Sequence, residues 1–353
     1  MEEYYDFVVI GGGPAGATVA RLLAQKYKIL IVERKNILNS EDNSLFKEKC
    51  CGGLLAPDAQ KVLAQFDIAL PEEIIGGPQI FAVKTIDLQT QQEQLFQRFY
   101  VNMNRAKFEE FLLKLAVESN VELVNNCHFL DFKDNIVSLK HNEVQKKVRC
   151  RKLIAADGAS SCVRKKCSKN ITRPQDLYVS IQELFPNTTN LQHFYAFFDA
   201  ELTDFYAWAI PKKEGILFGG AFPYENSKER FSQMKKKIVE QSIIEDKVIA
   251  REGSLILRPM VNRDFWCGNE NIFAIGEAAG WISPSSAEGF SYAFKSADIL
   301  AKILLNNPDA SLKKYYFKSL TIRKDIFCKW LKMPLMYNKT LRNIILKSSI
   351  GSI

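Results

Sequence analysis

The chain has 353 residues, of which 47% are hydrophobic and 25% charged, with 18 glycines and 12 prolines. This composition is typical of a globular protein of about two domains, and it excludes a disordered, collagen-like or low-complexity chain. No run of about 18 uncharged apolar residues is present, so no transmembrane helix is predicted. The net charge of +8 is uneven, because residues 311–353 hold ten Lys or Arg against one acid, which leaves the rest at −1.

The first thirty-odd residues predict a βαβ unit. Residues 6–10 form an apolar run typical of a buried strand, residues 17–26 have helical spacing, and residues 28–33 read as a second strand. The first strand runs directly into a glycine-rich turn, Gly11-Gly12-Gly13-Pro14-Ala15-Gly16. Strand, turn, helix and strand in this order are the context in which a Gly-x-Gly-x-x-Gly motif binds a dinucleotide.

Each glycine of this motif has its own expected task. Gly11 permits the tight turn, Gly13 lets the backbone approach a pyrophosphate, and Gly16 allows the helix to pack closely on the strand. The helix N-terminus adds free N–H groups and a partial positive charge. Glu33 and Arg34 end the second strand, where the carboxylate can accept hydrogen bonds from ribose hydroxyls. The unit alone fits FAD and NAD equally, since both contain adenosine diphosphate.

The rest of the chain alternates between two kinds of segment. We expect helices at 57–66, 105–117 and 288–305, strands at 121–124, 136–141, 152–156 and 272–275, and half-buried antiparallel strands at 81–88, 95–101 and within 177–262. The predicted fold class is α/β, or two-domain α+β, and the domains are discontinuous. They are a nucleotide-binding domain (1–75, 100–165 and 265–305), a β-rich substrate domain (76–99 and 166–264) and a basic helical C-terminal cap (306–353).

Three later landmarks resemble flavoproteins of the p-hydroxybenzoate hydroxylase fold. Ala156-Asp157-Gly158, with Arg164 downstream, is similar to one conserved segment of these proteins, and Gly276-Glu277 through Gly289-Phe290 is similar to another. Arg105 matches the arginine that contacts the FAD linker. The resemblance implies bound FAD within a Rossmann-like domain that carries an inserted antiparallel sheet. It also implies that the N–H groups of residues 289–291 stabilise negative charge on the flavin edge.

Within that fold, two motifs resemble the geranylgeranyl reductase family, and its CbrA-like branch in particular. Lys49-Cys50-Cys51-Gly52-Gly53, followed by Leu54, is similar to that family's loop near the flavin, so Cys51, Gly52 and Leu54 are expected at the cofactor. Tyr206-x-Trp208-x-Ile210-Pro211 is similar to its substrate wall. The chain departs from the pattern at Glu277, which stands for aspartate, at Ile210, which stands for phenylalanine, and at residues 285–288.

The resemblance implies reduction of carbon–carbon double bonds in a prenyl substrate by hydride transfer from reduced flavin N5. Cys51, Tyr206 and Trp208 are the candidate catalytic residues, with a proton coming from Cys51, Tyr206 or water. Simple packing is the alternative for each of them, since buried cysteines and strand aromatics are common core residues. A flavin monooxygenase, a flavin-dependent halogenase and a non-catalytic flavoprotein that carries lipid are the alternative functions. No lysine could be assigned to the position that a halogenase requires.

The sequence gives only broad expectations for the electron donor, the thiols, the localisation and the partners. Because no second glycine fingerprint follows a strand, NAD(P)H or a reduced redox protein is expected to bind only transiently. Eight cysteines without a CxxC pair, and only three histidines, predict reduced thiols and no metal site. The opening residues lack a signal-peptide pattern, which favours the cytoplasm. The basic tail either packs on the body or touches anionic lipid at the inner face of the membrane, and nucleic-acid binding is not expected.

Overall fold

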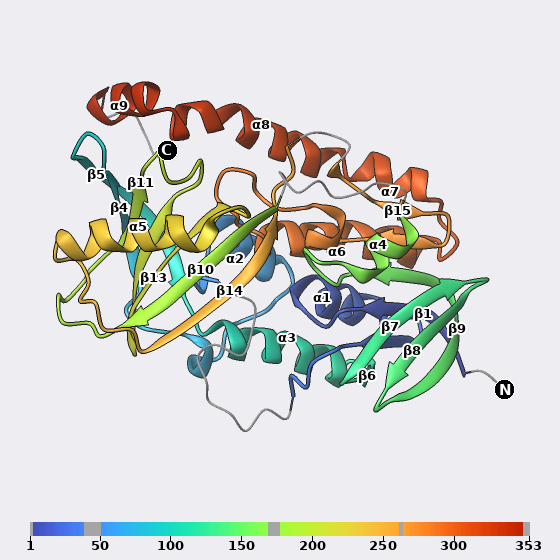
Figure 1. The fold of residues 1–353 in the computed structure, drawn as a ribbon. Helices are drawn as coiled ribbons and strands as arrows, with labels where there is room; N and C mark the ends of the chain where they lie inside the picture. Colours follow the sequence, from blue (N-terminus) through green and yellow to red (C-terminus); the bar gives the residue numbers. More distant parts are fainter. Residues whose placement is uncertain (1–2, 39–50, 169–176, 261–263, 349–353) are drawn as a thin grey trace.

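The structure is a computed structural model that describes residues 3–38, 51–168, 177–260 and 264–348. Two eight-stranded sheets stand side by side, and a row of C-terminal helices runs along one side of both (Figure 1). The mixed α/β architecture that the sequence predicts is confirmed. The site described below lies between the two sheets.

The first sheet has the order β15-β16-β9-β1-β2-β6, and the β7–β8 hairpin extends from β9. Its strands β2, β1, β9 and β16 are all parallel, so their carboxyl ends meet at one edge beside the glycine turn. Helices α1 and α6 contact each other, and α1 also contacts α3. The bounds are β1 (Glu3–Ile10), α1 (Pro14–Leu23), β2 (Ile29–Val32), α3 (Arg105–Glu118), β6 (Glu122–Val124), β7 (Cys127–Lys133), β8 (Ile136–His141), β9 (Val144–Ala155), α4 (Cys162–Cys167), β15 (Gly268–Asn269), β16 (Ile272–Ala274), a 3-10 turn (Gly276–Ala279) and α6 (Phe290–Asn306).

The second sheet has the order β14-β10-β13-β12-β11-β4-β5-β3 and is mostly antiparallel. Three of its strands, β3, β4 and β5, come from early in the chain, and β5 pairs with the short β3 that follows Cys51. The bounds are β3 (Leu54–Leu55), α2 (Pro57–Gln65), a 3-10 turn (Glu72–Ile74), β4 (Ile80–Asp87), β5 (Gln92–Asn102), β10 (Leu177–Phe185), β11 (Phe194–Phe198), β12 (Ala207–Lys212), β13 (Gly215–Pro223), α5 (Ser227–Glu240) and β14 (Ala250–Leu257).

Helix α5 interrupts a stretch that the sequence analysis treated as strand-rich throughout. Its three buried apolar residues, Phe231, Met234 and Ile238, are spaced by three and four, which is helical periodicity. They pack with one face of the second sheet, against Phe218 and Phe222 of β13. The other residues of α5 include ten polar ones, and they obscured this short pattern in a segment dominated by aromatic strands.

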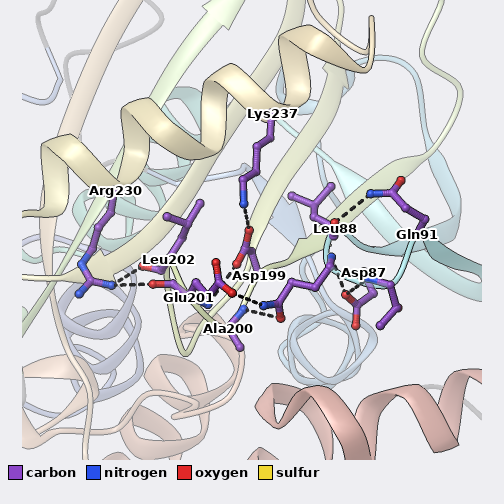
Figure 2. A network of polar contacts seen from close by, with 11 residues as sticks. Asp87, Leu88, Gln91, Asp199, Ala200, Glu201, Leu202, Arg230 and Lys237 are labelled. Carbon is purple, nitrogen blue, oxygen red and sulfur yellow. Dashed lines mark hydrogen bonds and ion pairs between the residues drawn. The ribbon is translucent and has the colours of Figure 1, made fainter.

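A polar network ties α5 to the end of the second sheet (Figure 2). Lys237 of α5 donates to the buried Asp199 at 2.6 Å, while Arg230 donates to the Leu202 carbonyl at 2.8 Å. On the neighbouring turn, Asp87 accepts the N–H groups of Gln89 and Thr90. These contacts fix the loops at this end of the sheet.

The C-terminal helices α7 (Leu312–Lys318), α8 (Leu320–Tyr337) and α9 (Lys339–Ser348) pack on both sheets (Figure 1). A proline usually ends a helix, which predicts a break at Pro334, but Pro334 lies within α8. The break comes at Asn338, whose side-chain oxygen accepts the N–H groups of Thr340 and Leu341 and thereby begins α9. From α9, Arg342 donates to Asp87 at 2.8 Å, and both side chains are buried.

Candidate active site

One cavity of about 520 Å³ lies between the two sheets, and it receives side chains from α8 as well. Of the residues that the sequence assigns to a cofactor, only Gly16 and Ser291 lie outside its lining. The residues that do line it are Gly11, Gly13, Pro14, Ala15, Glu33, Arg34, Cys51, Gly52, Leu54, Arg105, Ala156, Asp157, Gly158, Gly276, Glu277, Gly289 and Phe290, and the candidate catalytic residues Tyr206 and Trp208 join them. Cys50 lies outside the described residues.

The glycine turn has the geometry of a phosphate cradle. Gly11 has φ +103°, and a Cβ there would lie 2.5 Å from the Ala156 carbonyl oxygen. A Cβ on Gly16 would lie 1.9 Å from the Gly11 carbonyl oxygen, so this glycine is needed for packing beneath the turn. A Cβ on Gly13 would meet no atom within 4 Å, which leaves the backbone open toward the cavity. This open backbone at the N-terminus of α1 fits a pyrophosphate.

Glu33 stands at the end of β2, beside this turn. Its buried carboxylate accepts the Gly12 N–H at 2.7 Å and the Lys35 N–H at 3.0 Å. A carboxylate has about four acceptor positions. The group is therefore held in place by the backbone and still offers oxygen lone pairs to hydroxyl groups in the cavity. Arg34 is exposed at the rim.

The Asp157 carboxylate holds a loop together rather than pointing freely into the cavity. It accepts the Ser161 hydroxyl at 2.5 Å and the Cys162 N–H at 2.7 Å, just before α4. Burial raises the pKa of Asp157, while these hydrogen bonds act in the opposite direction. Gly158, with φ +74°, carries the backbone on past the cavity.

At the start of α6, one of the three N–H groups expected to stabilise negative charge on the flavin is already occupied. The Ser291 N–H is taken by the Glu288 carboxylate at 2.8 Å, so it is not available to a flavin. The reason is local: Glu288 lies just before the first turn and caps it through both Ser291 groups. The Gly289 and Phe290 amides belong to the first turn, whose N–H groups have no partner within the helix.

Cys51 and Arg105 lie together at the junction of the two sheets. The Cys51 thiol accepts the Gly53 N–H at 3.4 Å and interacts with the Arg105 guanidinium. Arg105 Nε donates to Glu109 at 2.8 Å, and its guanidinium lies 5.0 Å from the Phe290 ring centroid. Burial opposes the charge of Arg105, but Glu109 and Cys51 outweigh it and raise its pKa, so the side chain is a fixed cation.

Sequence reasoning missed Lys212, the residue directly after the Tyr-x-Trp-x-Ile-Pro motif. Its enclosed ammonium group donates to Asn102 Oδ1 at 2.6 Å and to the carbonyls of Met103 and Gly53 at 3.3 and 3.4 Å. All three acceptors are neutral. Burial therefore lowers the pKa of Lys212 to about 8. Lys212 therefore lies against the loop of Gly52 and Gly53.

Trp208 of β12 and Tyr206, directly before that strand, both line the cavity, as expected for residues two apart on an extended segment. Their ring centroids are 6.0 Å apart, and the Tyr206 hydroxyl donates to the Ser286 carbonyl at 3.3 Å. Trp208 lies over Gly219 of β13, where a Cβ would come within 2.8 Å of the indole nitrogen. Burial raises the pKa of Tyr206, so its phenol stays protonated at neutral pH.

Further lining residues were not assigned to the site from the sequence, and apart from residues 285–288 they come from segments that the motifs do not cover. On β5 an alternating set faces inward, and its period of two was the only sequence signal for it. Several α8 residues could not be placed at all from local patterns. The missed residues are Phe96, Arg98 and Tyr100 on β5, Phe194 and Phe198 on β11, Ser285, Ser286 and Glu288 before α6, and Lys329, Lys332 and Met336 on α8.

Comparison with known proteins identifies the family of this chain. The family model described as lycopene cyclase protein matches residues 6–336. The chain belongs to the lycopene cyclase family. This lycopene cyclase family member is similar to protein CbrA of Escherichia coli O9:H4 (strain HS), with 36% sequence identity over 355 aligned residues. The alignment covers 99% of this chain and 95% of CbrA.

Solved structures show the same fold for this family member. A geranylgeranyl bacteriochlorophyll reductase-like protein from Thermoplasma acidophilum superposes with a TM-score of 0.82 at 19% identity, over 99% of this chain and 93% of that one. CmlS, a flavin-dependent halogenase, superposes with a TM-score of 0.72 at 17% sequence identity. That superposition covers 92% of this chain and 63% of the CmlS chain. The expected fold of FAD-dependent oxidoreductases is thereby confirmed, while the reductase branch stays a prediction.

Proposed function

We propose that this chain binds FAD and reduces carbon–carbon double bonds of a prenyl substrate. The observation that carries the proposal is the continuity of one cavity. One end is a backbone cradle of glycines and Glu33, and the other is walled by aromatic side chains of the second sheet, with Cys51 and Arg105 at the junction. Such a cavity suits a dinucleotide whose reactive ring meets an apolar chain.

The residues present fit FAD. The open backbone at Gly13 would hold the pyrophosphate, and the Glu33 carboxylate the ribose hydroxyls. Arg105, a fixed cation at the cavity wall, would offset the negative charge of the cofactor. When bound and reduced, FAD supplies a hydride. The Gly289 and Phe290 amides at the start of α6 would orient its negatively charged edge.

Reduction of a double bond adds a proton as well as a hydride, and this chain offers two donors. The Tyr206 phenol is kept protonated by burial, and the Cys51 thiol lines the same cavity. Arg105 and Lys212 lie beside the Cys51 loop, where their charges would stabilise a thiolate after proton donation. Either residue would supply the proton that accompanies the hydride, and it would take up a proton from solvent before the next turnover.

The cavity favours an amphiphilic substrate. Phe96, Phe194 and Trp208 provide an apolar wall for a prenyl chain. Arg98, Lys329 and Lys332 line the same cavity and would bind an anionic head such as a diphosphate. For the electrons, we propose transient binding of NAD(P)H or of a reduced redox protein.

The test is anaerobic. The purified holoprotein is reduced with dithionite, geranylgeranyl diphosphate is added, and flavin absorbance and product mass are followed. Flavin reoxidation, with a product two hydrogens heavier for each bond reduced, supports the proposal. In Cys51→Ala reoxidation should slow by about 100-fold if the thiol donates the proton, whereas Cys328→Ala, an exposed thiol on α8, should match wild type.

The outcomes separate the alternatives. A flavin that stays reduced under nitrogen with every prenyl substrate, and reoxidises only with oxygen, overturns the reductase proposal. Hydroxylated product would then indicate a monooxygenase, and halide-dependent product a halogenase. A chain that purifies without flavin and takes none up would overturn the FAD assignment itself.

A further inference from the structure

The outer surface of the three C-terminal helices carries an unusual share of the exposed apolar residues. Nine of the nineteen large hydrophobic side chains that are exposed in the described part of the chain lie in α7, α8 and α9 or directly between them. We call the outer surface of these three helices, with its exposed side chains, the C-terminal face. Its apolar members are Tyr316, Phe317, Leu320, Phe327, Trp330, Leu331, Leu335, Leu341 and Ile344.

Helix α8 shows that this face is separate from the packing face. Ile322, Ile326 and Met333 are buried against the body. Phe327, Leu331 and Leu335 follow one another at spacings of four on the opposite side, and 54%, 56% and 43% of their surfaces are exposed. The helix is thus apolar on two sides, and the outer side has no partner among the described residues.

The exposed charges of the same three helices have one sign. Seven lysines of residues 311–348 are exposed, namely Lys313, Lys314, Lys318, Lys324, Lys332, Lys339 and Lys347, and of these Lys332 also lines the cavity. The single acid of this segment, Asp325, is taken by the Tyr292 hydroxyl at 2.6 Å and lies 3.7 Å from Lys329. The two arginines, Arg323 and Arg342, are buried. No carboxylate of the described segment is left to neutralise the lysines.

We propose that the C-terminal face binds the surface of an anionic lipid bilayer. Exposed aromatic and leucine side chains would enter the boundary between head groups and acyl chains, and the lysines would contact anionic head groups. No helix within the described ranges is long and apolar enough to cross a membrane, so this contact would be peripheral.

Two observations favour a bilayer over other partners. The three helices lie in a row along one side of the molecule, which suits an extended flat partner (Figure 1). A second copy of this chain would bring the same lysines against one another, and like charges in contact are unfavourable. In addition, Lys329 and Met336 of α8 line the cavity, so a bound bilayer would lie beside its wall.

The experiment measures cosedimentation of the full chain with vesicles of equal parts phosphatidylglycerol and phosphatidylcholine, and with pure phosphatidylcholine. Wild type should bind the anionic vesicles, and binding should weaken as salt is raised. In Phe327→Ser/Leu331→Ser/Leu335→Ser, the partition coefficient should fall by at least about tenfold. The matched control is Phe81→Ser/Leu95→Ser/Phe99→Ser, whose residues are as exposed on β4 and β5 and should leave binding unchanged.

The result does not depend on the proposed reaction, since binding is measured without turnover. Equal binding by wild type and the α8 variant, or no binding by wild type at low salt, would overturn the proposal. A lysine variant, Lys318→Glu/Lys324→Glu, should also weaken binding to anionic vesicles. If light scattering shows that wild type is a dimer and the α8 variant a monomer, the face is an interface between copies instead.

Discussion

The two ends of the cavity are built in different ways. At the cradle end the shape is made by backbone, with Gly11 and Gly16 packed so tightly that a single Cβ would overlap a carbonyl oxygen. At the other end the shape is made by side chains from β5, β11, β12 and α8, which are far apart in sequence. The first end is fixed by local spacing, whereas the second depends on long-range contacts that hold the second sheet and the C-terminal helices together.

The largest expected effect comes from breaking the cradle. Gly16→Val would place a Cβ 1.9 Å from the Gly11 carbonyl oxygen, and neither backbone segment can move away. We expect a loss of more than about 4 kcal/mol in the free energy of unfolding, measured by urea denaturation. Gly13→Ala is the control: its Cβ meets open space, so stability should stay within about 1 kcal/mol while flavin affinity falls. Equal damage by both would contradict the separate tasks of the two glycines.

The corresponding test at the end of the cavity that is built by side chains is to break the buried ion pair between Arg342 and Asp87. Removing one partner, as in Arg342→Met, leaves a buried carboxylate and should cost about 3–5 kcal/mol in thermal or denaturant unfolding. The double variant Asp87→Ala/Arg342→Met should recover part of this loss, because no uncompensated charge remains. Flavin content at low temperature should be retained, since the pair lies far from the glycine turn. Loss of flavin before unfolding would show that the two ends are not independent.

Lys212 provides a pH-dependent test where the two ends meet. Its pKa is about 8 in the folded chain and near 10.5 when unfolded, so the unfolded state binds more protons between these values. Stability contributed by Lys212 therefore rises with pH across that window. Relative to Lys212→Met, wild type should gain roughly 2–3 kcal/mol from pH 8 to 10.5 in parallel urea titrations. A difference that stays flat would mean that the ammonium is solvated.

The same contrast explains what the sequence could predict. The βαβ unit, the glycine turn and Arg105 were found because their chemistry depends on spacing within a short segment. Arg98 and the α8 residues were missed because only the packing of distant segments brings them to the cavity. Lys212 was missed for the same reason, since long-range packing places it on Asn102 and the Gly53 loop. Helix α5 was missed for a different reason, since its apolar residues are few and its neighbours have strand-like composition.

The smallest expected effect on stability is at Tyr206. Tyr206→Phe keeps the ring against Trp208 and loses only the hydroxyl that donates to Ser286, so stability should fall by about 1 kcal/mol. If Tyr206 is the proton donor, anaerobic flavin reoxidation should slow by about 100-fold, with flavin binding unchanged. A normal rate in Tyr206→Phe combined with a slow rate in Cys51→Ala would assign the proton to the thiol. Since burial keeps the phenol protonated, a Tyr206-dependent rate should not change across neutral pH.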